Sequence, residues 1–435
     1  MQEARRRERC RLDDGGSGLF NNGENQHMAK RSRPLVAIDI GTTKITALAA
    51  EQENGEISVT GIGSYPSHGI KKGLIINMDS TVDAIRRAVE GAAVMSDIDE
   101  HNVRIGIAGS HLQGFQSSGA IPLSTREVRK FDVQSVLEAA KAIVIPTERE
   151  VIQIISQEYR VDDQDDIVDP LGMAGVRLES RVYIITGAIS VARNIVKCMN
   201  RSGLKVIDMV PHHVASAEAV LTADEKELGC AVLDIGGGTT DIAVFCRGRL
   251  RYCSTLPIGG NQITSDIAIG LRTPISQAEI IKKDFGRAVF SSDYPEHSIT
   301  VASIGSDDER CISAGTLSRI IGARVEETLQ IVRRELVQSG MIEHLAAGVV
   351  LTGGSSQLEG LNGMAEKILG LAIRTGFPHD IKGISDINCP ECATAVGLLK
   401  TASTQPVVTV PVANRNARNT WRLGERMKHW LVEAF

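Results

Sequence analysis

Two short glycine turns, each set between two runs of apolar and β-branched residues, constrain the fold of this chain most strongly. The first lies in LVAIDIGTTKITALAAE, which begins at Leu35, and the second lies in CAVLDIGGGTTDIAVF, which begins at Cys230. Each turn follows Asp-Ile-Gly and carries a pair of threonines. Apolar runs on both sides of a glycine turn predict a β-hairpin. Because the hairpin recurs, we expect an internal duplication with two related domains that face one ligand.

The predicted ligand is a phosphate group. The turns have little side-chain bulk, so backbone N–H groups and threonine hydroxyls can approach a phosphate closely. In Rossmann and P-loop sites a helix follows the glycine loop, whereas a strand is predicted after both loops here. One such turn alone is equally compatible with a tight turn that binds nothing. The predicted phosphate-binding residues are Asp39, Gly41, Thr42, Thr43, Lys44, Asp234, Gly236, Gly237, Gly238, Thr239, Thr240 and Asp241.

Each predicted loop also has a candidate metal-holding group. Asp39 and Asp234 end the incoming strands, so each carboxylate is placed at its turn. Magnesium usually keeps several waters and is held by one or two carboxylates together with substrate phosphates. We therefore expect Asp39 and Asp234 to hold Mg²⁺ through water.

A third glycine loop and one charged pair predict where a nucleoside lies. GVVLTGGSS, which begins at Gly348, has the pattern of a buried strand that ends in a Gly-Gly loop, and helical spacing follows it. Such a loop lets a flat ring or a ribose lie against the backbone. The residues assigned to this end of the site are Gly353, Gly354, Ser355, Glu279 and Lys282. The last two share a predicted helical face and can bracket ribose hydroxyls, although such a pair is also typical of a solvated helix surface.

The end of the chain carries a different signal, because both of its tryptophans lie within residues 419–435. On a helical wheel the apolar side chains of this segment form one stripe opposite charged residues, which predicts an amphipathic helix. At about 1.5 Å per residue it is too short to cross a hydrocarbon core of about 30 Å, so we expect it to lie on a membrane surface. A helix docked on its own domain is the alternative, but residues 402–419 have the composition of a tether. The predicted membrane-contacting residues are Trp421, Leu423, Arg426, Met427, Trp430, Leu431 and Phe435.

Charge and cysteine usage exclude several other classes of protein. A net charge of -5 provides no general basic field for nucleic acid. The eight cysteines follow no regular framework, which predicts reduced thiols. Cys389 and Cys392 form the one close pair, and no second pair or histidines at ligand spacing accompany it, so we interpret them as structural cysteines rather than zinc ligands. Residues 1–33 are charged and glycine-rich, which predicts a disordered leader.

The motifs resemble those of the actin, Hsp70 and sugar-kinase superfamily. DIGTTK and DIGGGTTD look like its two phosphate motifs, and VVLTGGSS looks like its adenosine motif. From about Pro34 to Phe435 the chain is similar to the FtsA family of bacterial cell-division proteins, notably in GGNQITSDIAIGL and HLAAGVVLTGGSSQLEGL. The resemblance implies an α/β, actin-like two-lobed ATPase fold with duplicated RNase H-like domains, a 1C insertion and a C-terminal amphipathic helix. It also adds Gly260 and Asn261 to the nucleotide site.

The resemblance further implies a division of the chain into subdomains. We expect the leader to be followed by subdomain 1A, which the 1C insertion interrupts, and then by 2A, which 2B interrupts. The expected ranges are 34–109 and 188–222 for 1A, 110–187 for 1C, 223–269 and 340–401 for 2A, 270–339 for 2B, 402–419 for a flexible linker and 420–435 for the membrane-targeting helix.

By resemblance, the chain binds ATP and Mg²⁺, polymerises into an actin-like filament and anchors the FtsZ ring to the inner face of the cytoplasmic membrane at the division septum. The expected partners are the C-terminal tail of FtsZ, further copies of the chain, other division proteins and an anionic membrane surface. Arg324 matches a basic position at which the family receives the FtsZ tail, although taken alone it is typical of a solvated helix residue. Glu218 lies where the superfamily usually places a catalytic glutamine or carboxylate. Because relatives need not hold such a group, we expect a primarily structural ATP-binding protein with weak ATPase activity at most.

Three alternatives within the superfamily stay open from the sequence. A small-molecule kinase needs an acidic base and a sugar pocket opposite the γ-phosphate. An Hsp70-like chaperone needs a peptide-binding domain after the nucleotide domain, whereas a tether follows Lys400 here. A rod-shape or pilus-assembly actin homologue is nearer, and binding of the FtsZ tail separates it from the preferred interpretation.

Overall fold

The computed structural model describes residues 34–96, 98, 102–289, 298–303 and 309–404. The predicted leader, most of the predicted linker and the predicted membrane helix lie outside these residues. The described residues include both predicted hairpins and the third glycine loop, so the structure shows where the residues predicted to bind phosphate and nucleoside lie.

The first predicted hairpin is present and lies in the middle of a six-stranded sheet. β1 pairs with β2 in antiparallel register, and β6 pairs with β1 in parallel register on the other side. The strand order is β11-β6-β1-β2-β3-β19. The strands are β1 (Pro34–Ile40), β2 (Lys44–Glu53), β3 (Glu56–Pro66), β6 (Val103–Ile107), β11 (Val206–Pro211) and β19 (Lys382–Gly383).

The second hairpin has the same surroundings, which confirms the duplication. β12 pairs with β13 in antiparallel register and with β17 in parallel register, as β1 does with β2 and β6. The order in this five-stranded sheet is β14-β13-β12-β17-β18. The strands are β12 (Cys230–Ile235), β13 (Thr240–Cys246), β14 (Arg249–Leu256), β17 (Val349–Thr352) and β18 (Ile373–Thr375).

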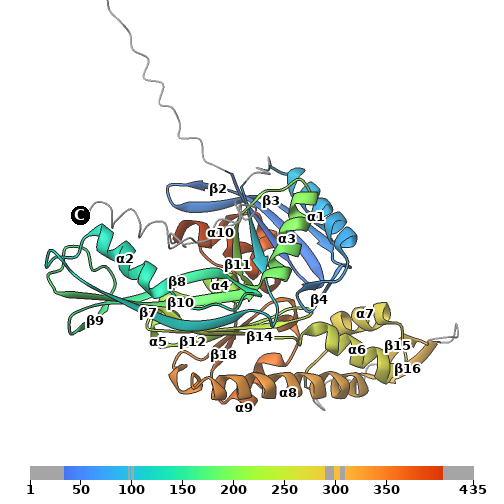
Figure 1. Ribbon diagram of the computed structural model, residues 1–435. Coiled ribbons are helices and arrows are strands. Elements are labelled where there is room, and N and C mark those ends of the chain that lie inside the picture. The colour runs from blue at the N-terminus through green and yellow to red at the C-terminus, as the bar shows by residue number, and fades with distance from the viewer. Residues whose placement is uncertain (1–33, 97, 99–101, 290–297, 304–308, 405–435) are drawn as a thin grey trace, which may run out of the picture. The chain divides into compact units, whose positions relative to one another are not determined.

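Helices cover both faces of each sheet, and one helix pair is shared between them (Figure 1). Because side chains alternate along a strand, Ile38 of β1 packs with α1 and α3, whereas Ala37 packs with α4 and α10. In the second sheet, Val232 packs with the same α4 and α10, and Leu233 packs with the helices on the outer face. The helices of these layers are α1 (Met78–Ala93), α3 (Ile189–Arg201), α4 (His212–Val220), α6 (Gly260–Leu271), α7 (Ile275–Phe285), α8 (Ala314–Gln338), α9 (Leu361–Leu369) and α10 (Ala393–Thr404).

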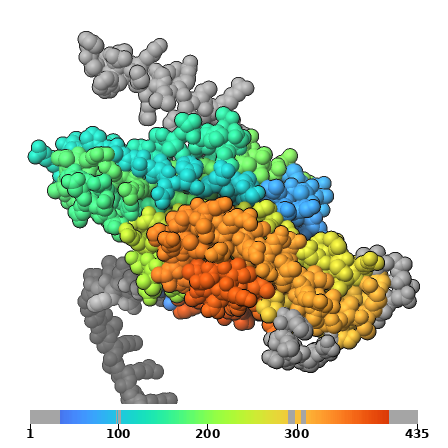
Figure 2. All heavy atoms as spheres, turned by 90° about the horizontal axis from the view of Figure 1, so that it is seen from below, coloured from blue at the N-terminus to red at the C-terminus, as the bar shows by residue number. Residues whose placement is uncertain are grey.

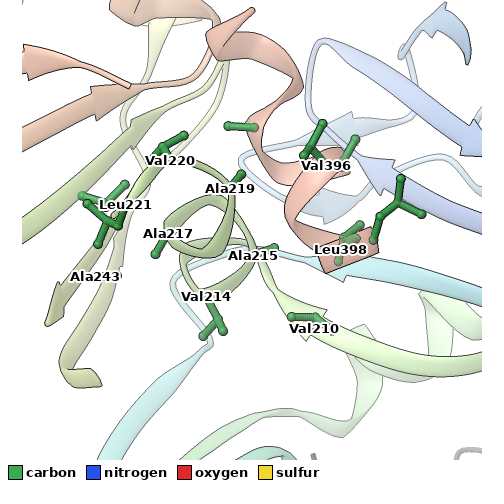
Figure 3. Close-up of a cluster of buried hydrophobic side chains, with 14 of the residues drawn as sticks. Val210, Val214, Ala215, Ala217, Ala219, Val220, Leu221, Ala243, Val396 and Leu398 are labelled. Carbon is green, nitrogen blue, oxygen red and sulfur yellow. The ribbon is translucent and has the colours of Figure 1, made fainter. Parts of the chain in front are cut away.

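The shared pair α4 and α10 packs very closely. All residues of α4 except Glu218 are buried, as expected of a helix enclosed on every side. A Cβ on Gly397 of α10 would lie 1.7 Å from the carbonyl oxygen of Ala215, so the two backbones approach as near as glycine allows. Figure 3 shows Ala215 and Ala217 of α4 in the apolar cluster that also contains Val396 and Leu398.

Part of the C-terminal segment belongs with the first sheet. The subdomain prediction assigned residues 340–401 to 2A, together with the second sheet. In the structure β19 pairs with β3, and α10 contacts β1, β2 and β6 as well as α4. The chain therefore returns from the second lobe to the first before it reaches Thr404, and α10 connects the two.

A separate four-stranded sheet lies within the first half, where an insertion was predicted. Its order is β7-β10-β8-β9, and α2 packs against β7 and β10. The buried carboxylate of Glu158 on β8 joins this sheet to β14, because it forms ion pairs with Arg249 (2.5 Å) and Arg251 (3.7 Å). The elements are β7 (Gln113–Pro122), α2 (Lys130–Lys141), β8 (Arg149–Val161), β9 (Gln164–Ile167) and β10 (Arg177–Ala188).

Short elements complete the described chain. The strand pairs β4–β5 and β15–β16 each form a two-stranded sheet, and α5 follows α4. Their bounds are β4 (Ile70–Lys71), β5 (Leu74–Ile75), α5 (Ala223–Leu228), β15 (Ser298–Ala302) and β16 (Glu309–Ser313). Among the described residues, no helix combines the length and hydropathy needed to cross a membrane.

Candidate functional site

The two glycine turns have the same backbone structure and face each other. The N–H of Gly41 donates to the carbonyl of Lys44 (3.1 Å), and the N–H of Gly236 donates to the carbonyl of Thr239 in the same way (2.9 Å). A Cβ on Gly237 would lie 1.7 Å from the hydroxyl oxygen of Thr43. The threonine side chains of the first loop thus lie directly against the glycine backbone of the second loop.

A cleft of about 790 Å³ lies between the lobes at these loops. Its volume is in the range of small-molecule and cofactor sites. All predicted nucleotide-binding residues line it except Thr240 and Gly260. Thr240 is fully buried and donates its hydroxyl to the carbonyl of Ile258 (2.8 Å), so it supports the second loop from behind. The N–H of Gly260 donates to the carbonyl of Gly236 (2.9 Å), which ties the start of α6 to the same loop.

The charged pair predicted for the nucleoside end is present and lines the cleft. Lys282 Nζ lies 2.7 Å from Glu279 Oε2 and donates to the hydroxyl of Thr264 (2.9 Å). That hydroxyl also lies 2.5 Å from Glu279 Oε2. The three side chains hold one another in place between α6 and α7, so they are ordered groups in the cleft rather than a freely solvated surface pair.

The third loop closes the same end. Gly353 follows β17 with a φ of 83°, which favours glycine, and its N–H donates to the carbonyl of Pro390 (3.1 Å). The hydroxyl of Ser355 donates to the carbonyl of Gly236 (3.1 Å). The second and third loops are therefore joined directly, and both contribute backbone to one cleft.

Three buried carboxylates carry the strongest electrostatic signal of the site. Burial raises the pKa of Asp39, Asp234 and Asp241 to about 6, and Lys44 partly offsets this for Asp39. Thr394 of α10 donates to Asp234 (2.9 Å) and Thr255 donates to Asp241 (2.5 Å). At neutral pH these three carboxylates are ionised, and burial of their charge costs free energy. A nearby cation would offset that cost.

This donor set fits a magnesium ion held through water. The buried Oδ1 of Asp39 makes no hydrogen bond, although Nε2 of His212 lies 3.2 Å away, and it can accept from a metal-bound water. Within the described part of the chain, no cluster of three or more His, Cys, Asp or Glu is arranged to bind a metal directly. The orphaned carboxylate oxygen is compatible with Mg²⁺, which is commonly bound through water and phosphate rather than in a cage of protein ligands.

The raised pKa of Asp234 predicts how stability depends on pH. The pKa of Asp234 is higher in the folded chain than in the unfolded chain, so the protonated carboxyl stabilises the fold at low pH. That stabilisation is lost as the pH rises through about 6. We expect Asp234→Asn to raise the free energy of unfolding of the nucleotide-free protein by ~2 kcal/mol at about pH 7.5, and by less at about pH 5. Urea unfolding at both pH values measures this difference.

The matched control is Asp83→Asn, because Asp83 is an exposed carboxylate on α1. It should change the free energy of unfolding by less than ~0.5 kcal/mol at either pH. An Asp234→Asn protein that is less stable than the wild type at both pH values contradicts the assignment of a buried, costly charge.

The structure does not bring Glu218 into the cleft. Its carboxylate lies 2.8 Å from Nζ of Lys226, away from the residues that line the site. Its catalytic role stays an untested prediction. His212, at the start of α4, lines the cleft instead, with Nε2 3.2 Å from Oδ1 of Asp39. Burial lowers the pKa of His212, so its imidazole is neutral at physiological pH.

Sequence reasoning missed several further cleft residues. Three of them are His212, Pro390 and Glu391, and Glu391 forms an ion pair with Lys44 of the first loop (3.2 Å). None of these three belongs to a glycine motif. No local sequence pattern marked Pro390 or Glu391, which lie more than thirty residues after the third glycine loop.

The facing hairpins, the shared helix pair and the cleft between them define the actin-like ATPase fold. The chain is similar to the solved PilM-PilN type IV pilus biogenesis complex, with a TM-score of 0.60 and 16% identity over 86% of this chain and 99% of that chain. It is also similar to MreB 5 of Spiroplasma citri bound to AMPPNP, with a TM-score of 0.51 and 14% identity over 93% and 99% of the two chains. At these identities the likeness shows the fold alone.

Sequence comparisons identify the family within this fold. Residues 231–397 match the family Cell division protein FtsA, and residues 109–186 match the SHS2 domain inserted in FTSA. The chain is 43% identical to Cell division protein FtsA of Neisseria meningitidis serogroup B over 415 residues, which cover 94% of this chain and 100% of the relative. The chain therefore belongs to the FtsA family of bacterial cell division proteins. The four-stranded insertion is its SHS2 domain.

Proposed function

We propose that the chain binds ATP with Mg²⁺ in this cleft, polymerises at the membrane and anchors the FtsZ ring to the inner face of the cytoplasmic membrane. The observation that carries the proposal is the pair of facing glycine loops, one from each lobe, which line one cleft. MreB 5 of Spiroplasma citri, which has the same fold, was solved bound to AMPPNP, and this supports nucleotide binding by the fold.

In this proposal each group of cleft residues has one task. The backbone N–H groups of the two loops and the ammonium of Lys44 bind phosphate oxygens. Glu279 and Lys282 bind the ribose hydroxyls, and the Gly353–Ser355 loop lies against the nucleoside. Asp39 and Asp234 hold Mg²⁺ through water, and the ion supplies charge neutralisation between the phosphates and these carboxylates.

Nucleotide binding then acts on conformation more than on chemistry. Groups from both lobes contact one ligand, so the ligand stabilises the closed arrangement relative to an open one. We propose that the closed arrangement is the one that polymerises and that turnover is weak. Among the described cleft residues, Asp39, Asp234 and Asp241 are buried carboxylates with raised pKa values. The other two, Glu279 and Glu391, are each paired with a lysine. None of the five is therefore well suited to orient an attacking water.

The proposed docking region for the FtsZ tail includes α8, whose atoms lie in the orange part of the surface in Figure 2. Arg324 on α8 is already held within the protein. Its Nε and Nη2 contact the two carboxylate oxygens of Asp266 on α6 (2.5 and 3.1 Å), and Nη1 contacts Glu327. A peptide that uses this guanidinium must therefore compete with Asp266.

That competition gives a directional test. We expect Arg324→Ala to weaken binding of a fluorescent FtsZ tail peptide by about tenfold, because a charge-assisted hydrogen bond is lost. Asp266→Ala is the control, since it removes the competing carboxylate and should not weaken binding. Fluorescence anisotropy measures both affinities. Equal affinity of the wild type and Arg324→Ala would remove Arg324 from the proposed interface.

Membrane attachment is proposed to depend on residues 420–435, which lie outside the described residues. One amphipathic segment is expected to bind reversibly, whereas a filament that displays many copies gains avidity. Co-sedimentation with anionic vesicles, with and without magnesium ATP and FtsZ, tests the function as a whole. We expect ATP to increase the bound fraction and FtsZ to sediment only when the protein is present. Failure of FtsZ to sediment under these conditions would falsify the anchoring function.

A further inference from the structure

Two cysteines adjoin the cleft, and the proposed function does not use them. Cys389 and Cys392 flank Pro390 and Glu391, two residues that line the cleft, in a short 3₁₀ turn immediately before α10. The sequence alone is compatible with a pair of structural thiols. Their position gives them a direct connection to the nucleotide site.

The two sulfur atoms are already close together. Cys389 Sγ lies 2.9 Å from Cys392 Sγ, and a disulfide requires about 2.05 Å, so a shift of less than about 1 Å joins them. Cys392 is buried, whereas Cys389 is half-buried and therefore reachable from solvent. Both are free thiols, and no metal-binding cluster of three or more ligands occurs among the described residues.

The surroundings of the pair favour a reactive outer thiol and a buried inner one. The hydrogen bond with Cys392 and the nearby ammonium of Lys44 lower the pKa of Cys389 to about 7. The same hydrogen bond and burial raise the pKa of Cys392. This asymmetry is typical of Cys-x-x-C pairs that undergo exchange, in which the first cysteine is the attacking thiolate.

We propose that Cys389 and Cys392 form a reversible redox site that exchanges electrons with small-molecule or protein disulfides. The thiolate of Cys389 attacks one sulfur of the external disulfide, forms a mixed disulfide and releases one thiolate. The sulfur of Cys392, after loss of its proton, then attacks Cys389 Sγ and displaces the second thiolate. The pair loses two electrons and two protons, and the external disulfide is reduced to two thiols.

The site is connected to three parts of the cleft. Glu391 pairs with Lys44 of the first loop, and the carbonyl of Pro390 accepts from the N–H of Gly353 in the third loop. Thr394, two residues after Cys392, donates to Asp234 (2.9 Å). We therefore expect the redox state of the pair and occupancy of the cleft to affect each other. This coupling, unlike the redox chemistry itself, rests on the proposed nucleotide binding.

The test treats the reduced full-length protein with oxidised glutathione and identifies the products by peptide mass spectrometry. Cys311 is the internal control, because it is exposed but has no described cysteine within bonding distance. We expect Cys389 and Cys392 to become linked to each other and Cys311 to carry glutathione. In Cys392→Ser the second step is blocked, so glutathione should remain on Cys389. If Cys389 and Cys392 remain free thiols while Cys311 reacts, or if each carries its own glutathione, the proposal is wrong.

A second arm tests the coupling separately. Phosphate groups that engage Lys44 withdraw its charge from Cys389, so magnesium ATP should slow disulfide formation by about threefold. Calorimetry on the same samples reports whether ATP binds. An unchanged rate with ATP bound overturns the coupling, whereas absence of ATP binding overturns the proposed function and leaves the glutathione result to decide the redox site.

Discussion

A chain that ends at residue 419 should fail to sediment with anionic vesicles under conditions in which the full-length protein is mostly bound. The removed segment carries five or six apolar side chains on one predicted helical face, and burial of each contributes ~1.5–3 kcal/mol. Ordering about fifteen residues at ~1 kcal/mol each offsets most of this gain. The basic residues near the segment add on the order of 1 kcal/mol each at an anionic surface. The net affinity is modest, and its loss should be complete.

The same truncation should leave nucleotide binding unchanged, because every described cleft residue precedes residue 405. Trp430→Glu should reproduce the loss of vesicle binding in the full-length chain, since it places a charge in the apolar stripe. Glu425→Gln is the matched control on the polar face and should not reduce binding. Sedimentation of the truncated protein with vesicles at the wild-type level contradicts the proposed role of the segment.

The second large effect concerns the contact between the two glycine loops. We expect Gly237→Val to weaken ATP binding at least ~100-fold, which corresponds to ~2.7 kcal/mol. The first added carbon alone would lie 1.7 Å from Oγ1 of Thr43, so either the Thr43 side chain must rotate or the loops must separate, and the branched side chain also fills space predicted for phosphate. Titration calorimetry with magnesium ATP measures the change.

Gly363→Val controls for the substitution itself. Gly363 lies in α9, away from the cleft, and a Cβ there meets no atom within 4 Å. That variant should bind ATP as the wild type does. Circular dichroism and a thermal unfolding curve establish that Gly237→Val is folded. Wild-type affinity in a folded Gly237→Val protein contradicts the phosphate position assigned to the loops.

The hairpins and the third loop could be predicted because their signals are local. A strand pattern, a glycine turn and a second strand pattern lie within about fifteen consecutive residues, and backbone conformation limits what such a stretch forms. The pairing of β1 with β2 and of β12 with β13 confirms both hairpins. Their repetition also gave the correct inference that two related lobes face one cleft.

What the sequence did not show depends on contacts between distant residues. Glu391 reaches Lys44 across 347 positions of sequence, and β19 returns to β3 from the far end of the chain. No local pattern marks such contacts. His212 was overlooked because it lies in an enclosed apolar helix, where a histidine is usually a core residue. Its position beside Asp39 follows from the parallel pairing of β11 with β6, which sets where α4 begins.

The central claim is that side-chain-poor loops from both lobes bind one nucleotide. It is tested most directly by titrating the reduced full-length protein with magnesium ATP in a calorimeter and repeating a thermal unfolding curve at millimolar ATP. A bound ligand at about 100 times its Kd stabilises the folded state by ~2.7 kcal/mol. We predict saturable binding to a single site together with an increase in Tm. Absence of both the binding heat and the Tm increase at millimolar magnesium ATP would contradict the account.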